Sequence, residues 1–325
     1  MRAMVMAAGL GTRLRPLTYE IPKPLVPVAN RPVMEHILRL LRRHGFGPVI
    51  ANLHWFPETI RDRFGDGSGL GIDLTYSYED ELLGTAGGVR NVAEFFGEEP
   101  FLVMAADALT DIDLAALRAA HAANGGIATL AVKRVSEVSE FGVVITDSAG
   151  RIQGFQEKPD PAEALSDLAS CMIYVLEREI FDYFPSKPVV DFAREVFPAL
   201  LEHDVPFHVH RIDAYWNDVG SLPEYLRGNL DAVEAEVELE PAGELLQARG
   251  TDEAVERGDP GVGGRVLAAE GFEIGAEVRL DGPLVIGAGC TIGAGAQVRE
   301  SVLLPGAEVP PGALVASAIY GRGPT

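Results

Sequence analysis

The chain has 325 residues, of which 47% are hydrophobic and 23% charged, and its formal net charge is −21 at pH 7. A protein this acidic is not expected to bind nucleic acid, because phosphate backbones are attracted to basic surfaces. No apolar run approaches the ~20 residues of a membrane span, and the chain's two cysteines cannot form a disulfide framework, so we expect no membrane association and a cytoplasmic location.

Through the first 230 residues, short apolar runs alternate with amphipathic stretches of helical length. Such runs indicate buried strands, and their alternation with helices predicts an α/β, Rossmann-like, mainly parallel sheet with helices on both faces. Residues 141–159 interrupt the alternation, and their Gly-containing turn predicts an antiparallel hairpin. The predicted strands are residues 3–8, 48–53, 72–78, 101–106, 127–132 and 171–176, and the predicted helices are residues 32–45, 57–64, 85–96 and 113–126.

Beyond residue 230 the sequence changes character. Residues 231–262 are acidic and then Gly-rich, which predicts a connector. An aliphatic series of period six follows, which neither a helix (about 3.6) nor a flat strand (about 2) produces, but a parallel β-helix does. We therefore predict a first domain at 1–230, the connector at 231–262, and a short left-handed β-helix of hexapeptide repeats at 263–325 whose open ends favour a homo-oligomer. The two series are Ile274, Leu280, Ile286, Ile292, Val298 and Leu304, and Val278, Leu284, Cys290, Ala296 and Val302.

The first predicted strand leads into a glycine-containing loop, residues 7–18 (AAGLGTRLRPLT). Ligands of open α/β sheets bind at the carboxyl ends of the strands. Gly9 and Gly11 let the backbone approach a ligand closely, and Arg13 adds positive charge, so this loop is a candidate site for a small anion such as a phosphate. The P-loop sequence GxxxxGK[ST] is absent, and Leu14 stands where the dinucleotide-binding fingerprint would have its third glycine.

The segment GLGTRLRPLTYEIPKPLVPVANRP, residues 9–32, resembles the signature of the nucleotidyltransferase family of sugar-nucleotide pyrophosphorylases, which is GxGTRLxPLT followed by PKPL. The resemblance implies a nucleotidyltransferase catalytic domain at 1–230 that takes a nucleoside triphosphate and a sugar 1-phosphate and releases pyrophosphate. Hexapeptide tails also occur in this family. Further matching segments are LLGTAGG (82–88), AADALTDIDL (105–114), FGVV (141–144), FQEKP (155–159) and WNDVG (216–220).

The resemblance also implies a role for individual residues. Arg13 and Lys23 would bind the triphosphate and the departing pyrophosphate, and Lys158 would hold the sugar phosphate. Asp107 and Asp218 would share a Mg²⁺ that bridges the phosphates, since Mg²⁺ is commonly held by one or two carboxylates plus substrate oxygens. The implied nucleotide-binding residues are Gly9, Leu10, Gly11, Thr12, Gly84, Thr85, Ala86 and Gly87, and the implied sugar-binding residues are Gly142, Glu157 and Ser170.

Two places depart from the family pattern. Ala106 stands before the predicted metal ligand, where the family usually has glycine. Ser170, Cys171 and Met172 replace the family's usual asparagine, alanine and glycine, and that asparagine contacts the sugar in many members. The sugar is therefore the substrate that the sequence constrains least.

The segment EDELLGTAGG, residues 79–88, is close to the guanylyl-transferring branch of the family. It also lacks the glutamine that thymidylyl-transferring relatives usually have there. The resemblance therefore favours GTP and mannose 1-phosphate as substrates and GDP-mannose as product. Thymidylyl or uridylyl transfer to glucose 1-phosphate is the alternative. A non-catalytic regulatory homologue is a third hypothesis, which is disfavoured because the predicted catalytic and metal-binding residues are all present.

Overall fold

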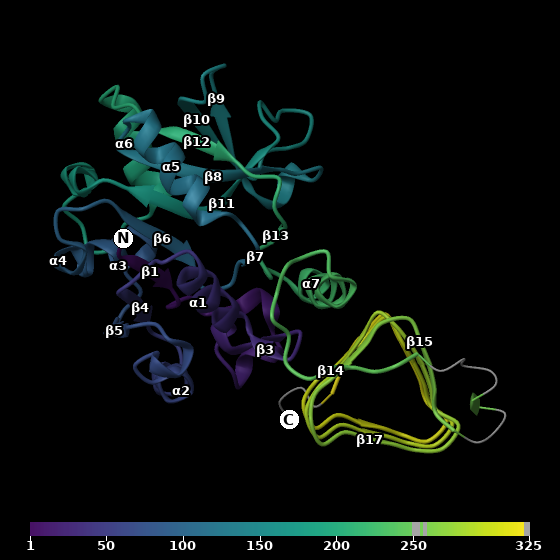
Figure 1. Cartoon of the computed structure of the whole chain (residues 1–325). Coiled ribbons are helices and arrows are strands. Elements are labelled where there is room, and N and C mark those ends of the chain that lie inside the picture. The colour runs from purple at the N-terminus through teal and green to yellow at the C-terminus, as the bar shows by residue number, and fades with distance from the viewer. Residues whose placement is uncertain (249–253, 256–258, 322–325) are drawn as a thin grey trace. The chain divides into compact units, whose positions relative to one another are not determined.

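A computed structural model describes residues 1–248, 254–255 and 259–321 of the chain (Figure 1). Parts of the predicted connector and the end of the predicted β-helix lie outside the described residues. The chain divides into two compact units, each assembled from separate stretches of sequence. The first unit consists of Met1–Leu10, Ile37–Ala108 and Ile112–Trp216, and the second of Gly11–His36, Leu109–Asp111 and Asn217–Thr325.

A nine-stranded sheet forms the centre of the first unit. Strands β6, β1, β4 and β5 are neighbours in that order and pair in parallel, and a parallel arrangement is what the sequence predicts. The apolar runs of β6, β1 and β4 are largely buried, whereas β5 is mostly exposed or half-buried. Strand β11 is antiparallel to β6, β8 and β9, so the prediction of a mainly parallel sheet is wrong for this part and the sheet is mixed. The strands are β1 (Ala3–Met6), β4 (Val49–Leu53), β5 (Leu74–Tyr78), β6 (Phe101–Ala105), β8 (Ala128–Arg134), β9 (Gly142–Thr146), β10 (Ile152–Glu157), β11 (Leu168–Leu176) and β12 (His208–Arg211).

The connection between β8 and β11 explains this change of direction. Parallel neighbours require a crossover, usually a helix, that returns the chain to the same end of the sheet. Here the chain instead passes through the hairpin of β9 and β10, whose antiparallel pairing confirms the hairpin predicted at residues 141–159. Strand β11 therefore enters the sheet in the opposite direction.

Helices cover both faces of the sheet, as predicted. Successive strand residues point to opposite faces. In β8, Leu130 belongs to the apolar core shared with α3 and α6, whereas the Thr129 hydroxyl lies 3.0 Å from Nδ1 of His121 in α5. In the described parts of the chain no helix combines the length and the apolar character needed to cross a membrane. The helices are α1 (Val33–Arg43), α2 (Pro57–Phe64), α3 (Gly84–Asn91), α4 (Ala93–Phe96), α5 (Leu114–Asn124) and α6 (Phe197–Glu202), with α3 and α4 dividing the single helix predicted at 85–96.

In the second unit, the segment that follows Lys23 is held by helix α7 and by the C-terminal strands. The backbone N–H of Ala29 donates to Oδ1 of Asn229, a fully buried residue of α7, over 2.9 Å. The Asn30 amide donates to the backbone oxygen of Ile286 over 3.1 Å. The segment is thus tied to two elements far away in the sequence, α7 (Leu222–Glu234) and β19 (Leu284–Ile286).

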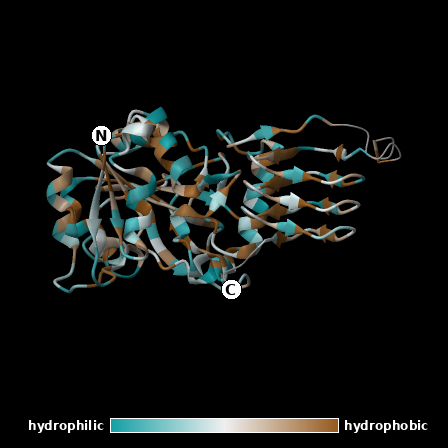
Figure 2. Cartoon of the chain, turned by 90° about the horizontal axis from the view of Figure 1, so that it is seen from below, coloured by the Kyte–Doolittle hydropathy of each residue, from teal (hydrophilic) through white to brown (hydrophobic). Residues whose placement is uncertain are grey.

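From Gly261 onward, the chain passes in turn through three small sheets with parallel neighbouring strands. In Figure 1 these strands outline a triangle, and in Figure 2 they are seen from the side, one above another. Aliphatic residues from all three sheets meet in one buried core inside this triangle. The strands are β15 (Gly261–Gly263), β16 (Val266–Ala268), β17 (Glu273–Ile274), β18 (Arg279–Asp281), β19, β20 (Thr291–Ile292), β21 (Gln297–Arg299), β22 (Val302–Leu303), β23 (Glu308–Val309), β24 (Leu314–Ala316) and β25 (Ile319–Tyr320), and β14 (Glu244–Leu245) pairs antiparallel with β16.

The predicted six-residue period holds as far as Val298 and then slips by one position. Leu280 pairs with Val298, three hexapeptides further along the chain. Ile286, however, pairs with Leu303 and not with the predicted Leu304. Val302, the last member of the other series, likewise pairs with Val285 and not with Leu284. The last member of each predicted series is therefore wrong by one residue, because the third turn of the chain is one residue shorter there.

Candidate active site

The predicted phosphate-binding loop begins at the carboxyl end of β1. Within the described residues, no heavy atom lies within 4 Å of where a Cβ of Gly9 would be, so the backbone is open at this point. Gly11 has a φ of 62°, and a Cβ there would lie only 2.9 Å from Cβ of Lys23. The Thr18 hydroxyl donates to the Gly11 carbonyl over 2.7 Å, and a 3₁₀ turn at Thr12–Leu14 follows. Gly11 is therefore required both by its backbone conformation and by the close approach of Lys23.

Three of the predicted site residues converge in the second unit. The Lys23 ammonium donates to the backbone oxygen of Asp218 over 3.2 Å, and Nη2 of Arg13 lies 3.8 Å from Oδ2 of Asp218. Lys23 is 8% exposed, whereas the Arg13 side chain is 58% exposed. The structure thus places a buried cation on the backbone of Asp218 and a solvent-exposed cation beside its carboxylate. Two cations so arranged can bind an anion with several negative charges.

A tight turn at residues 217–220 presents the Asp218 carboxylate. The buried Asn217 accepts the Val219 N–H over 2.7 Å and donates to the Glu224 carbonyl over 3.1 Å. Val219 has a φ of 42°, a strained value for a β-branched residue that its surroundings must enforce. At Gly220 a Cβ would lie 2.5 Å from Oδ2 of Asp218. Sequence reasoning missed the positioning role of Asn217, although it stands in the motif WNDVG.

Asp107 follows β6 in the first unit and is partly exposed. The preceding Ala106 is buried and its N–H donates to the Met6 carbonyl over 3.0 Å, so alanine fits where the family usually has glycine. Carboxylate oxygens such as those of Asp107 and Asp218 are suitable ligands for Mg²⁺. Over residues 1–248, 254–255 and 259–321, no cluster of three or more His, Cys, Asp or Glu side chains could hold a metal.

The hairpin of β9 and β10 brings three predicted sugar-phosphate residues together. Gly142 pairs with Glu157 across the hairpin, and a Cβ at Gly142 would lie 3.1 Å from Oε2 of Glu157. Lys158 follows with a φ of 46°, and its N–H donates to the Phe141 carbonyl over 3.0 Å. Glu157 and Lys158 are both exposed at this end of the hairpin, where they are accessible to a ligand.

Ser170 lies on β11, next to the hairpin. Its neighbour Ala169 pairs with Val143 of β9, and the register of β11 shifts between Ser170 and Tyr174. The Ser170 and Tyr174 hydroxyls are 3.4 Å apart. Burial raises the pKa of Tyr174 well above its ordinary value, so its hydroxyl keeps its proton. Met172, inside the shifted stretch, has a φ of 53°, a value at which the family's usual glycine would be unstrained.

The predicted base-binding residues Gly84–Gly87 form the first turn of α3, and this turn packs tightly against Val190. The N–H groups of Ala86 and Gly87 both donate to the Val190 carbonyl over 2.9 Å. The Thr85 hydroxyl donates to Oδ2 of Asp191 over 2.8 Å and accepts the Phe192 N–H over 3.0 Å. The Thr85 hydroxyl proton and the N–H groups of Ala86 and Gly87 are therefore used within the protein. A bound base could donate a hydrogen bond to the remaining lone pair of the Thr85 hydroxyl, and it could pack against the backbone of this helical turn.

Gly84→Ala is expected to destabilise the protein. Gly84 has a φ of 80°, and a Cβ there would lie 2.5 Å from the Val190 carbonyl oxygen. Strain of this kind costs ~1–3 kcal/mol, which lowers the melting temperature by roughly 2 to 10 °C in a protein of this size. Thermal denaturation measures the effect. Gly69→Ala is the matched control, because no described atom lies within 4 Å of its Cβ position. Equal melting temperatures for the two variants would contradict this expectation.

Comparison with known proteins identifies the family. A family model described as "Nucleotidyl transferase" matches residues 2–235. The chain belongs to this family.

Curated relatives of this nucleotidyl transferase agree with the match. The chain is 38% identical over 341 residues to the UTP--glucose-1-phosphate uridylyltransferase of Synechocystis sp., which covers 99% of the chain and 88% of the relative. It is 36% identical over 301 residues to the mannose-1-phosphate guanylyltransferase of Mycobacterium tuberculosis, covering 89% and 82%. Both names denote transfer of a nucleotidyl group to a sugar 1-phosphate, so the predicted family and activity class are confirmed.

Solved structures support the fold. A protein from Bacillus anthracis crystallised with sucrose superposes with a TM-score of 0.66 at 22% identity, over 74% of this chain and 97% of the other. HddC from Yersinia pseudotuberculosis superposes with a TM-score of 0.61 at 21% identity, over 70% and 97%. At this identity the likeness concerns the fold alone, and it confirms the α/β architecture.

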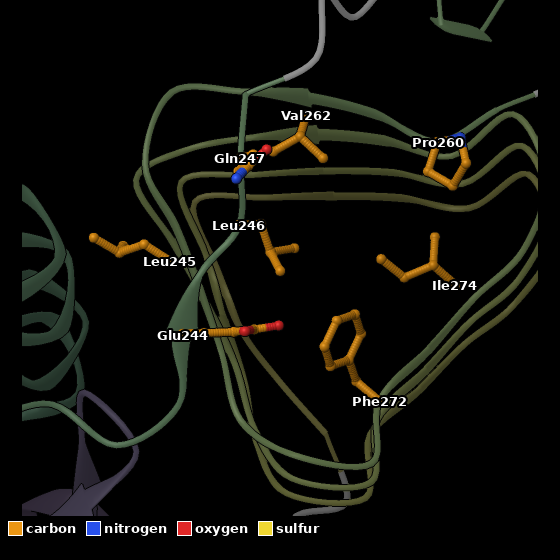
Figure 3. Close-up of a pocket in the computed structure, with 8 residues that line it drawn as sticks. All are labelled: Glu244, Leu245, Leu246, Gln247, Pro260, Val262, Phe272 and Ile274. Atoms are coloured by element: carbon orange, nitrogen blue, oxygen red, sulfur yellow. The ribbon is translucent and has the colours of Figure 1, made fainter.

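A separate pocket of about 500 Å³ lies among the first C-terminal strands of this nucleotidyl transferase (Figure 3). Leu246, Phe272 and Ile274 point into the interior of the triangle formed by those strands. Its other lining residues are Glu244, Leu245, Gln247, Pro260 and Val262. The pocket contains none of the predicted site residues, so it does not form part of the candidate active site.

Proposed function

We propose that Arg13, Lys23 and Lys158 hold the phosphates while an oxygen of the sugar 1-phosphate attacks the α-phosphorus of a nucleoside triphosphate in line. The new Pα–O bond forms as the bond between Pα and the β-phosphate oxygen breaks, and pyrophosphate leaves with that electron pair. Such a displacement needs positioning and charge stabilisation and no protein nucleophile. Burial also raises the pKa of the Cys171 thiol, which keeps it protonated and unreactive.

The convergence of Arg13 and Lys23 on Asp218 is the observation that carries this assignment. Lys23 is buried and its ammonium is held in place, so it meets the triphosphate with little reorganisation. The more exposed Arg13 would contact the departing pyrophosphate. Lys158 would bind the sugar phosphate and Glu157 a sugar hydroxyl, because both are exposed at the same end of the hairpin.

Mg²⁺ is the cofactor that we propose for this reaction, with Asp107 and Asp218 as its protein ligands. Both side chains offer carboxylate oxygens and both are partly exposed. When bound, the ion supplies charge neutralisation for the phosphate oxygens. The turn at Asn217–Gly220 would orient the Asp218 carboxylate, since Gly220 N–H donates to its Oδ1 over 3.1 Å.

GTP and mannose 1-phosphate are the proposed substrates, and GDP-mannose is the proposed product. The guanylyltransferase relative and the absence of a glutamine from residues 83–88 support this pair. UTP with glucose 1-phosphate is the second candidate, and the uridylyltransferase relative, which aligns with 99% of the chain, supports it. The shorter Ser170 in place of asparagine favours modest discrimination between sugar epimers, within ~1–3 kcal/mol.

A matrix of nucleoside triphosphates against sugar 1-phosphates, read by pyrophosphate release, tests the proposal. We expect the highest kcat/KM for GTP with mannose 1-phosphate and a reduced rate with glucose 1-phosphate. A clear preference for UTP or dTTP with glucose 1-phosphate would replace the base assignment and leave the mechanism unchanged. Absence of pyrophosphate release with every pair would instead favour a non-catalytic homologue.

We further propose that the C-terminal strands form a left-handed β-helix that contributes to a homo-oligomer. The parallel pairing of strands three hexapeptides apart and the single apolar core inside the triangle support a β-helix. The outer edges of β15 and β17 have no strand partner within the described residues, and unpaired edges favour association. Sedimentation of the full chain tests the oligomer, and a purely monomeric species would contradict it.

A further inference from the structure

Two buried polar side chains, Asn52 and Glu79, lie between Ala7, at the start of the phosphate-binding loop, and Leu83, directly before α3, in the first unit. Asn52 belongs to β4 and is 5% exposed, while Glu79 directly follows β5 and is 6% exposed. A buried carboxylate is costly unless all of its hydrogen bonds are made. Its retention at this place in the fold therefore requires a physical reason.

The two side chains form one continuous chain of hydrogen bonds. The Ala7 N–H donates to Oδ1 of Asn52 over 2.8 Å, and Nδ2 of Asn52 donates to Oε1 of Glu79 over 2.7 Å. The Leu83 N–H donates to Oε2 of Glu79 over 3.1 Å. Ala7 opens the loop that contains Gly9, and Leu83 directly precedes α3, whose first turn is Gly84–Gly87.

The surroundings leave little room for another arrangement. A Cβ at Gly88 would lie 2.6 Å from Oε1 of Glu79 and 2.8 Å from Nδ2 of Asn52, so any larger residue there would displace the pair. The backbone carbonyl of Glu79 also lies 2.8 Å from Nδ1 of His54. The network is therefore enclosed and held on several sides.

We propose that Asn52 and Glu79 are positioning residues for the nucleotide. This inference rests on the proposed function and names residues that act through the two segments that they join rather than on the substrate. By joining Ala7 to Leu83, the pair holds the start of the phosphate-binding loop and the start of α3 at a fixed separation. A nucleoside triphosphate that contacts both segments is then bound with its α-phosphorus in position for the attack.

The hydrogen-bond polarity of the network requires one carboxylate. The backbone N–H groups of Ala7 and Leu83 donate to the network at its two ends. Asn52 and Glu79 must therefore each offer an acceptor to a backbone N–H, and one of the two must donate to the other. Glu79→Gln places a donor against a donor whichever way either amide is turned. Asn52→Asp places two acceptors against each other. The double variant Asn52→Asp, Glu79→Gln restores every donor–acceptor pair. The new carboxylate at position 52 accepts both the Ala7 N–H and the new amide N–H at position 79, and the amide oxygen at position 79 accepts the Leu83 N–H.

Kinetics of these three variants test the inference. Each single variant is expected to raise the KM for the nucleoside triphosphate roughly 10- to 100-fold, since an opposed buried donor or acceptor loses its hydrogen bond and its hydration. The KM for the sugar 1-phosphate is expected to stay within about twofold, because the network does not touch the hairpin residues. The double variant is expected to recover most of the nucleotide affinity. Glu81→Gln, the same chemical change at an exposed neighbour, is the matched control.

Binding of GTP and of UTP to each variant, measured by calorimetry, gives a readout that does not depend on turnover. An unchanged nucleotide KM in Glu79→Gln, an equal rise of both KM values, or a double variant no better than the weaker single variant would each overturn the inference while leaving the proposed function intact. Failure of the parent chain to release pyrophosphate with any substrate pair would overturn the proposed function, and this inference with it.

Discussion

Asp107→Asn and Asp218→Asn are each expected to lower kcat by about 10² or more, because charge stabilisation at phosphorus supplies much of the barrier reduction. An amide keeps the size of the side chain and removes its charge. In Asp218→Asn the remaining oxygen still accepts the Gly220 N–H, so the turn at residues 217–220 is preserved. The loss then reports on the charge and not on the fold.

Metal dependence is part of the same expectation. Excess EDTA should abolish pyrophosphate release by the parent chain, and added Mg²⁺ should restore it. The variants should need a higher Mg²⁺ concentration for half-maximal activity. Asp113→Asn is the matched control, because Asp113 caps α5 through the Ala116 N–H over 2.9 Å and asparagine caps helices equally well. Full activity in EDTA would contradict the metal assignment.

Lys23→Ala and Lys158→Ala are expected to impair the enzyme in different ways. Each change removes a charge-assisted hydrogen bond worth ~1.5–3 kcal/mol, or roughly 10- to 150-fold. Lys23 is buried and bonded to the Asp218 backbone, so its loss should lower kcat and weaken nucleotide use. Lys158 is exposed at the end of the hairpin, so its loss should mainly raise the KM for the sugar 1-phosphate.

Steady-state kinetics with each substrate varied in turn separates the two effects. Arg151→Ala is a suitable control, since Arg151 is a basic residue at the other end of the same hairpin, where it pairs with Asp204 over 2.5 Å. It should leave both KM values close to those of the parent. Identical kinetic patterns for the two lysine variants would show that the division of roles is wrong.

Local sequence patterns predicted the elements of the fold better than their directions in the sheet. The apolar run at 171–176 reads the same for a parallel and an antiparallel strand, and only the hairpin that precedes it decides the direction of β11. Likewise, Leu303 and Leu304 are equally apolar, so the period alone could not reveal which of them pairs with Ile286. Direction and register depend on connections and neighbours that a single segment does not contain.

The candidate site shows the same contrast. The motif residues Arg13, Lys23 and Asp218 could be named from the sequence through the family resemblance, and the structure brings them together in the second unit. The family resemblance implies that Gly84 and Gly87 bind the nucleotide, and the structure shows that both also allow close packing against Val190. Asn52 and Glu79 were missed altogether, because a polar residue at a strand end is common and its partners lie far away in sequence.

The contact between Asn30 and Ile286 has a consequence for the order in which the protein is made. The two residues are 256 positions apart, and a ribosome that adds about 5–20 residues per second needs roughly 13 to 50 seconds to cover that distance. During this interval the segment that follows Lys23 emerges without its final anchor. The segment that follows Lys23 can therefore make this contact only near the end of translation. A chain that ended after residue 235, where the family match ends, would lack Ile286 and so lack this hydrogen bond.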